Sequence, residues 1–158
     1  MSCQRQLPDF ATAAWYRDPS DHRCPHDAWL EAIEISEPAT GERKEKRQTA
    51  ITIRLLGAYH DGEIIFRYSG VSSYVVASIA SKDGIGDWLR DEFSVCDAGT
   101  LRHRITWCSG LATESSWEIL AEGISYEWKT RQANKPPEAM AVKCPPSNPF
   151  QAPAMPHL

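Results

Sequence analysis

The chain has 158 residues, of which 42% are hydrophobic and 24% charged, a composition ordinary for one globular domain. Its formal net charge of -4 argues against a nucleic-acid-binding protein, because such a domain normally carries a basic face. No stretch approaches about 18 consecutive apolar residues and no charged N-terminal region precedes an apolar run, so a soluble, cytoplasmic protein with no membrane partner is expected.

The N-terminal third predicts a short helix followed by two paired strands. The helix is expected over 7–16 (LPDFATAAWY), and the Asp-, Pro- and Ser-rich segment 17–25 is typical of an irregular connector. Strands are expected over 28–36 and 49–60, paired with each other. The segment between them, 37–48 (EPATGERKEKRQ), has six consecutive charges of both signs and predicts a solvated hairpin tip.

The clearest pattern is a β-hairpin over 50–74 (AITIRLLGAYHDGEIIFRYSGVSSY). The Asp61-Gly62 pair favours a two-residue type I′ turn, because both positions need positive φ. Such a turn would pair Leu55 with Tyr68. Alternation along the two strands then predicts one apolar core face, formed by Ile51, Ile53, Leu55, Tyr59, Ile64, Phe66 and Tyr68.

Two further elements follow the hairpin. Residues 71–80 look extended, and the preceding Ser69-Gly70 pair predicts a bend or bulge. Residues 87–93 (DWLRDEF) are expected to form a short helix, in which Asp87 caps the N-terminus and Trp88, Leu89 and Phe93 provide apolar contacts.

Two strands complete the predicted domain. The first, over 101–108, alternates so that one face collects Leu101, His103, Ile105 and Trp107. The second, over 117–128, changes the phase of its apolar positions at Gly123, where a β-bulge would keep both sets on the core side.

The elements together predict a mainly β fold. We expect an antiparallel meander of about six strands that closes as a partial barrel or a sandwich, with one or two short helices, because an open sheet of this size must cover its apolar face. This single domain is expected over 1–130. Seven prolines between 136 and 156 predict that 131–158 is an extended or disordered tail.

Three side chains of metal-ligand type lie two residues apart in segment 21–27 (DHRCPHD): His22, Cys24 and His26. An extended backbone would place them on one side, which predicts either a metal site, and with it a metal-dependent hydrolase, or a polar lead-in to the first strand. The five cysteines show no repeating spacing and fit a reducing compartment. No phosphate loop, nucleophile elbow or Cys-His hydrolase motif is present, so a non-enzymatic protein with no cofactor and no catalytic residue is favoured.

Four segments follow one another in an order that carries a resemblance: HDAWL at 26–30, IIFRYSGVSSYVV at 64–76, GDWLRDEF at 86–93 and ESSWEILAEGISYEW at 114–128. This layout resembles that of small bacterial β-rich proteins, some of which are immunity proteins that bind and block a partner toxin. The resemblance covers residues 26–128 and implies a protein-binding function. It assigns no functional residue, since its motifs consist of core and turn positions.

The sequence therefore favours a protein-binding module that acts through surface complementarity. Candidate contacts come from the acidic and aromatic positions of 87–93 and from the mixed face of the hairpin: Asp87, Trp88, Asp91, Glu92, Arg54, His60 and Arg67. An alternative is a homo-oligomeric structural subunit that pairs through an exposed edge strand.

Overall fold

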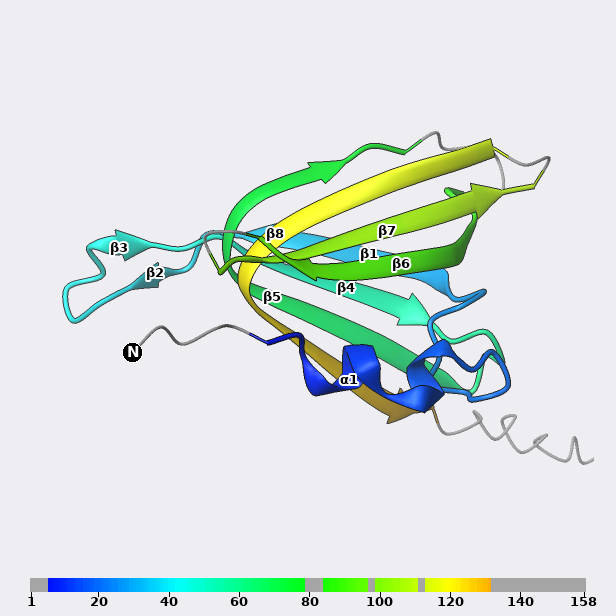
Figure 1. The fold of residues 1–158 in the computed structure, drawn as a ribbon. Coiled ribbons are helices and arrows are strands. Elements are labelled where there is room, and N and C mark those ends of the chain that lie inside the picture. Colours follow the sequence, from blue (N-terminus) through cyan, green and yellow to red (C-terminus); the bar gives the residue numbers. More distant parts are fainter. Residues whose placement is uncertain (1–5, 79–83, 97–98, 111–112, 132–158) are drawn as a thin grey trace, which may run out of the picture.

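The computed structural model describes residues 6–78, 84–96, 99–110 and 113–131, and its mainly β architecture confirms the predicted fold class. Six strands form one antiparallel sheet, in the spatial order β1 (Trp29–Ser36), β4 (Ala50–Leu56), β5 (Gly62–Val76), β8 (Thr113–Thr130), β7 (Leu101–Ser109) and β6 (Asp87–Val95) (Figure 1). The remaining elements are α1 (Asp9–Thr12), the 3-10 helix η1 (Ala14–Arg17) and a separate hairpin of β2 (Ala39–Thr40) and β3 (Lys46–Arg47). No helix in the described ranges is long and apolar enough to cross a membrane.

The six strands close into a ring that is a partial barrel. The meanders β1-β4-β5 and β6-β7-β8 are joined through the long pairing of β5 with β8. The ring is completed between β1 and β6 by one pair of residues, Trp29 with Asp87. These two strands pair nowhere else along their described lengths. The backbone amide of Trp88 extends this seam by donating to the carbonyl of Ala28 at 3.0 Å.

β5 and β8 bend together, so each strand serves both halves of the ring (Figure 1). Gly70 adopts a φ of +59°, a conformation that glycine favours, which confirms the bend predicted before residue 71. From Tyr68 to Val71 the pairing with β8 shows no register shift, so neither strand has an extra residue opposite the other at Gly123. The β-bulge predicted at Gly123 is therefore wrong, and the register shifts instead between Val71 and Ser73.

The β4–β5 hairpin forms on the predicted strands but in another register. Leu55 pairs with Ile64, four residues earlier in β5 than predicted. The loop is longer than a type I′ turn: the amide of Gly57 donates to the carbonyl of Gly62 at 3.0 Å, and the positive φ falls on His60. Because the register differs by an even number of residues, the same side chains still face the core.

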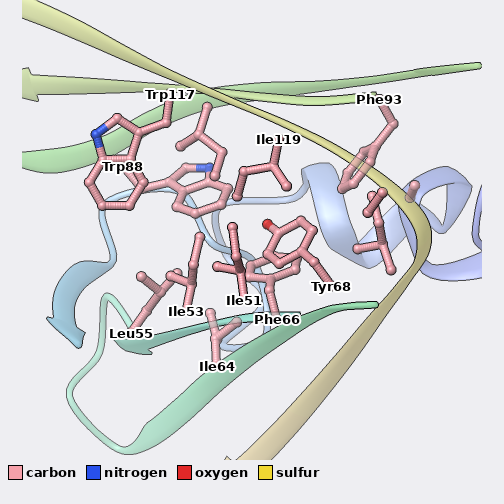
Figure 2. Packing of buried hydrophobic residues seen from close by; sticks show 14 of the residues in the cluster. Ile51, Ile53, Leu55, Ile64, Phe66, Tyr68, Trp88, Phe93, Trp117 and Ile119 are labelled. Carbon is pink, nitrogen blue, oxygen red and sulfur yellow. The ribbon is translucent and has the colours of Figure 1, made fainter. Parts of the chain in front are cut away.

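Large side chains fill the interior of the ring (Figure 2). The predicted hairpin face is buried at six of its seven positions: Ile51, Ile53, Leu55, Ile64, Phe66 and Tyr68. Tyr59, the seventh, lies in the loop and is 49% exposed. The predicted inward face of β7 is confirmed, with Leu101, His103, Ile105 and Trp107 all buried.

Residues 87–95 form strand β6, so the helix predicted over 87–93 is wrong. The pairing with β7 shifts between Trp88 and Arg90, which makes Leu89 a bulge. The bulge lets both Trp88 and Phe93 point inward although they lie an odd number of residues apart.

The N-terminal helices pack against the interior face of the sheet. Ala13 is extended between them, so the helix predicted over 7–16 forms as two short pieces. The ring of Phe10 lies 5.5 Å from that of Phe93 on β6, 6.1 Å from that of Phe66 on β5 and 5.4 Å from that of Tyr126 on β8. This segment thus contacts three strands of the ring: β5, β6 and β8.

Two further predictions concern segment 37–48 and the C-terminal tail. Every residue of 37–48 is exposed, as expected for a solvated hairpin tip. The tail predicted over 131–158 lies outside the described residues beyond Arg131.

Gly62 offers a test of this packing. A Cβ atom at this position would lie 2.1 Å from ring carbons of Trp128, so we expect Gly62→Ala to lower the free energy of unfolding by about 1–3 kcal/mol. The same change on a Trp128→Leu background should cost much less, since the obstructing ring is absent. Urea denaturation measures both, and an equal cost on the two backgrounds would contradict this role for the glycine.

Candidate functional site

A chain of hydrogen bonds runs through the interior of the ring and ends at Asp91. Tyr68 Oη lies 2.7 Å from His103 Nδ1, and His103 Nε2 lies 2.8 Å from Asp91 Oδ2. Tyr16 Oη lies 2.6 Å from the same carboxylate oxygen. We call these four residues the Asp91 chain. The side chain of His103 is 0% exposed and that of Asp91 is 10% exposed, so the chain is almost wholly enclosed.

The Asp91 chain is assembled from four elements that are distant in sequence. Tyr68 comes from β5, His103 from β7, Asp91 from β6 and Tyr16 from η1. The bulge at Leu89 sets the phase of β6 so that Asp91 faces His103. Without this bulge, a regular strand that buries Trp88 would turn the carboxylate outward.

Charge and burial determine where the protons of the chain lie. The carboxylate of Asp91 can only accept, so His103 Nε2 carries a hydrogen and donates it. Burial lowers the pKa of His103, against the opposing effect of Asp91, so the ring is neutral and its Nδ1 accepts from Tyr68. Burial, and then the charge of Asp91, raises the pKa of the Tyr16 hydroxyl. The Asp91 carboxylate thus accepts its hydrogen bonds from two neutral groups, the Tyr16 hydroxyl and the His103 imidazole.

A small cavity of about 140 Å³ opens beside Asp91, between the N-terminal segment and β6. Its walls include Pro25 and Trp88, together with the thiol-bearing Cys24. Asp91 Oδ2 is occupied by Tyr16 and His103, whereas no described residue donates a hydrogen bond to Oδ1.

A second hollow, of about 420 Å³, lies where β4, β5 and β8 bend, around Thr52, Ser69 and Gly123. The charged side chain in its lining, Arg67, is ion-paired with Glu127 at 2.6 Å. Convergent polar groups of the kind that orient a ligand are therefore a feature of the cavity beside Asp91 rather than of this hollow.

The three predicted metal ligands are not brought together. His22 lies 2.5 Å from Asp61 on the β4–β5 loop, Cys24 is 4% exposed in the core, and His26 lines the cavity. The physical reason is that the backbone turns here, with the amide of Cys24 bonded to the carbonyl of Asp21, whereas the prediction assumed an extended segment. No group of three or more His, Cys, Asp or Glu side chains within the described ranges is arranged to hold a metal ion.

The predicted contact residues of 87–93 are divided by the strand geometry. Trp88 is 1% exposed in the core, and Asp91 faces the interior, so neither lies on the surface where the prediction placed it. Asp87 and Glu92 are exposed on β6. The cause is the bulge at Leu89. A helix or a regular strand would have placed Asp87 and Asp91 on the same side, whereas the bulge turns Asp91 inward and leaves Asp87 outside.

The predicted contacts on the mixed face of the hairpin remain outside. Arg54 and Arg67 are exposed, while Ile65 between them in this face is 3% exposed. The N-terminal helices pack on the opposite, interior face and leave these arginines uncovered. Arg67 is held by its ion pair with Glu127.

His60, the last predicted contact, belongs to a cluster of exposed aromatic rings at one end of the ring of strands. Its imidazole meets the indole of Trp29 edge-on at 4.6 Å, and the imidazole of His22 stacks on Tyr59 at 4.1 Å. Trp29 is 50% exposed and Tyr59 is 49% exposed. Tyr59 Oη donates to the carbonyl of Pro19 at 3.0 Å, which fixes the ring. We call Trp29, His60, Tyr59 and His22 the aromatic rim.

Sequence reasoning missed both Tyr16 and the inward position of Asp91. The one signal for the Asp91 chain was His103, a polar residue at a core position of an alternating strand. A buried polar side chain requires partners, but the sequence does not show which residues supply them.

Comparison of the chain with protein-family models, with curated proteins and with solved structures finds no match. The function therefore has to follow from the geometry of the Asp91 chain, its cavity and the aromatic rim.

The hydroxyl of Tyr16 ties the N-terminal segment to the sheet, so its removal has a defined cost. We expect Tyr16→Phe to lower the free energy of unfolding by about 1.5–3 kcal/mol, because a buried hydrogen bond to a charged group is lost. Tyr59→Phe is the matched control, since its hydroxyl bonds Pro19 at an exposed site. Equal effects of the two variants in urea denaturation would contradict the role of Tyr16.

The neutral state of His103 makes stability depend on pH in a defined direction. The unfolded chain binds a proton near the ordinary pKa of about 6.5, whereas burial lowers the pKa in the fold. Stability is therefore fully present above about pH 6.5 and falls on acidification, by up to about 1.4 kcal/mol per pH unit. His103→Gln should lose this part of the pH dependence, which is measured as the free energy of unfolding between pH 7.5 and about 5. Parallel curves for the two proteins would overturn the assignment.

Proposed function

We propose that the protein is a non-enzymatic binding module that recognises a partner protein through the aromatic rim. The observation that carries the proposal is the half exposure of Trp29 and Tyr59 in fixed positions. Tryptophan and tyrosine dominate the binding energy of many protein interfaces, since each buries a large area with few rotatable bonds. Rings that are already held in place lose little conformational freedom on binding.

The interior of the ring of strands supports binding at the surface. Trp107 and Ile105 are 0% exposed, and Trp88 and Trp117 are 1% and 2% exposed. The indoles pack on one another, with 5.3 Å between the rings of Trp88 and Trp107 and 5.0 Å between those of Trp107 and Trp117. A ligand of appreciable size cannot enter without displacing this core.

The chemistry of the partner follows from the charge of the protein and from the resemblance of residues 26–128 to immunity proteins. A formal net charge of -4 favours a partner with a basic contact surface. A toxin is the first class of partner to test, because immunity proteins act by binding one. On this proposal the protein blocks its partner by covering it and carries out no chemistry.

The proposal predicts that binding depends on the rim and not on exposed aromatic area in general. Immobilised wild-type protein should capture one stoichiometric partner from its native lysate, and Trp29→Ala and Tyr59→Ala should each reduce that capture at least about tenfold, equivalent to about 1.4 kcal/mol. Tyr74→Ala is the matched control, since Tyr74 is 45% exposed on β5. Quantitative mass spectrometry of the captured material measures the three variants.

Folding of each variant is checked by urea denaturation, because Trp29 and Tyr59 also contact neighbouring rings. Undiminished capture by both rim variants would contradict the proposal. Loss with Tyr74→Ala alone would move binding to the outer edge of β5, where Ser72–Val76 has ladder partners only in β8 among the described residues. That edge is also where the alternative of homo-oligomeric assembly would act.

A further inference from the structure

The cavity beside Asp91 contains a carboxylate whose hydrogen bonding is incomplete. Tyr16 and His103 both donate to Oδ2, and no described residue donates to Oδ1. The side chain is 10% exposed, and Asp91 is one of the residues that line the cavity. A carboxylate this deeply placed normally has a full set of donors or a cationic partner.

No arginine or lysine of the described residues forms an ion pair with Asp91. Its ionisable partner is His103, which is neutral because burial lowers its pKa. Arg90 lines the cavity but turns to Glu114, with contacts of 2.9 and 3.3 Å. Arg17, the other basic residue in the lining, is exposed and makes no ion pair with a described residue. The negative charge of Asp91 is therefore left without a cation.

Neighbouring carboxylates act on Cys24, a wall of the cavity. After burial, the charges of Asp91, Asp18 and Asp21 raise the pKa of the Cys24 thiol. The thiol donates to the carbonyl of Tyr16 at 3.1 Å, so it is a protonated wall of the cavity and not a nucleophile. Asp21 is already paired with Arg23 at 2.8 Å, so a cation entering this space would be attracted mainly by Asp91.

The remaining walls fit an alkyl chain. Pro19, Pro25, Trp88 and Leu89 give the cavity an apolar lining. The cavity volume of about 140 Å³ is well above the ~10–15 Å³ needed to hold one water, so a small ligand can enter. A short unbranched chain ending in a charged donor fits both the size of the cavity and the position of Asp91.

We propose that this cavity binds a primary alkylammonium group, whose nitrogen donates to Asp91 Oδ1. Tyr16 and His103 position the carboxylate by holding Oδ2. The ammonium can come from a free amine or from a lysine side chain of a partner protein. The second source rests on the proposed function, because Pro19 lines the cavity and also accepts the hydrogen bond from Tyr59 of the aromatic rim.

The test is a titration of the full-length, folded protein by two-dimensional ¹H–¹⁵N NMR at pH 7. The probe is n-butylammonium chloride, and n-butanol and sodium butyrate are the neutral and anionic controls of similar length. We expect saturable shifts of the Trp88 and Asp91 amides with n-butylammonium, and at least tenfold weaker binding of both controls. Asp91→Asn should reduce the affinity for n-butylammonium at least tenfold. Glu92→Gln, an exposed carboxylate of the same strand, should not.

Nα-acetyl-lysine N-methylamide distinguishes the two sources of the ammonium. Binding comparable to that of n-butylammonium assigns the cavity to a lysine side chain, and binding of n-butylammonium alone assigns it to a free amine. Wild-type protein that shows no saturable shift with n-butylammonium, or that binds n-butanol equally well, overturns the proposal. This comparison decides the question even if Asp91→Asn fails to fold. A negative capture experiment with the aromatic rim would leave the free-amine result standing.

Discussion

Two hydrogen bonds that converge on Asp91 Oδ2 join the N-terminal segment to the sheet, and much of the structure depends on them. The ring of strands closes between β1 and β6 through one pair, so its closure has little support from the ladder itself. The bond from Tyr16 adds a connection from η1 to β6, and the bond from His103 adds one from β7 to β6. A buried polar network with missing partners destabilises a fold. The Asp91 chain therefore favours the arrangement that brings Tyr16, Tyr68 and His103 to their hydrogen-bond partners.

The same geometry separates the inside of the molecule from the surfaces that are free to bind. Inside, indole and phenol rings fill the space and leave one carboxylate oxygen without a donor among the described residues. Outside, the aromatic rim exposes rings that neighbouring groups already hold. Pro19 connects the two regions, because it lines the cavity and bonds Tyr59.

Alternation of side chains was enough to predict most of the core. It identified the buried face of β7 and six buried positions of the hairpin, because a register change by an even number of residues leaves the faces unchanged. The same reasoning failed for β6, because the bulge at Leu89 breaks the alternation and lets Trp88 and Phe93, an odd number of residues apart, both point inward. Gly62 was also misinterpreted: its lack of a side chain accommodates the ring of Trp128, a contact that no local pattern reveals. The Asp91 chain eluded prediction since it joins Tyr16 to a residue 75 positions away.

A neutral His103 donates from Nε2 to the carboxylate of Asp91 and accepts from Tyr68 at Nδ1. Long-range ¹H–¹⁵N NMR correlation of the imidazole ring at pH 7 tests it most directly, because the two nitrogen shifts report the tautomer and the charge of the ring. We expect one protonated nitrogen, Nε2, and one unprotonated nitrogen, Nδ1. An imidazolium ring, or a neutral ring protonated at Nδ1, would contradict it.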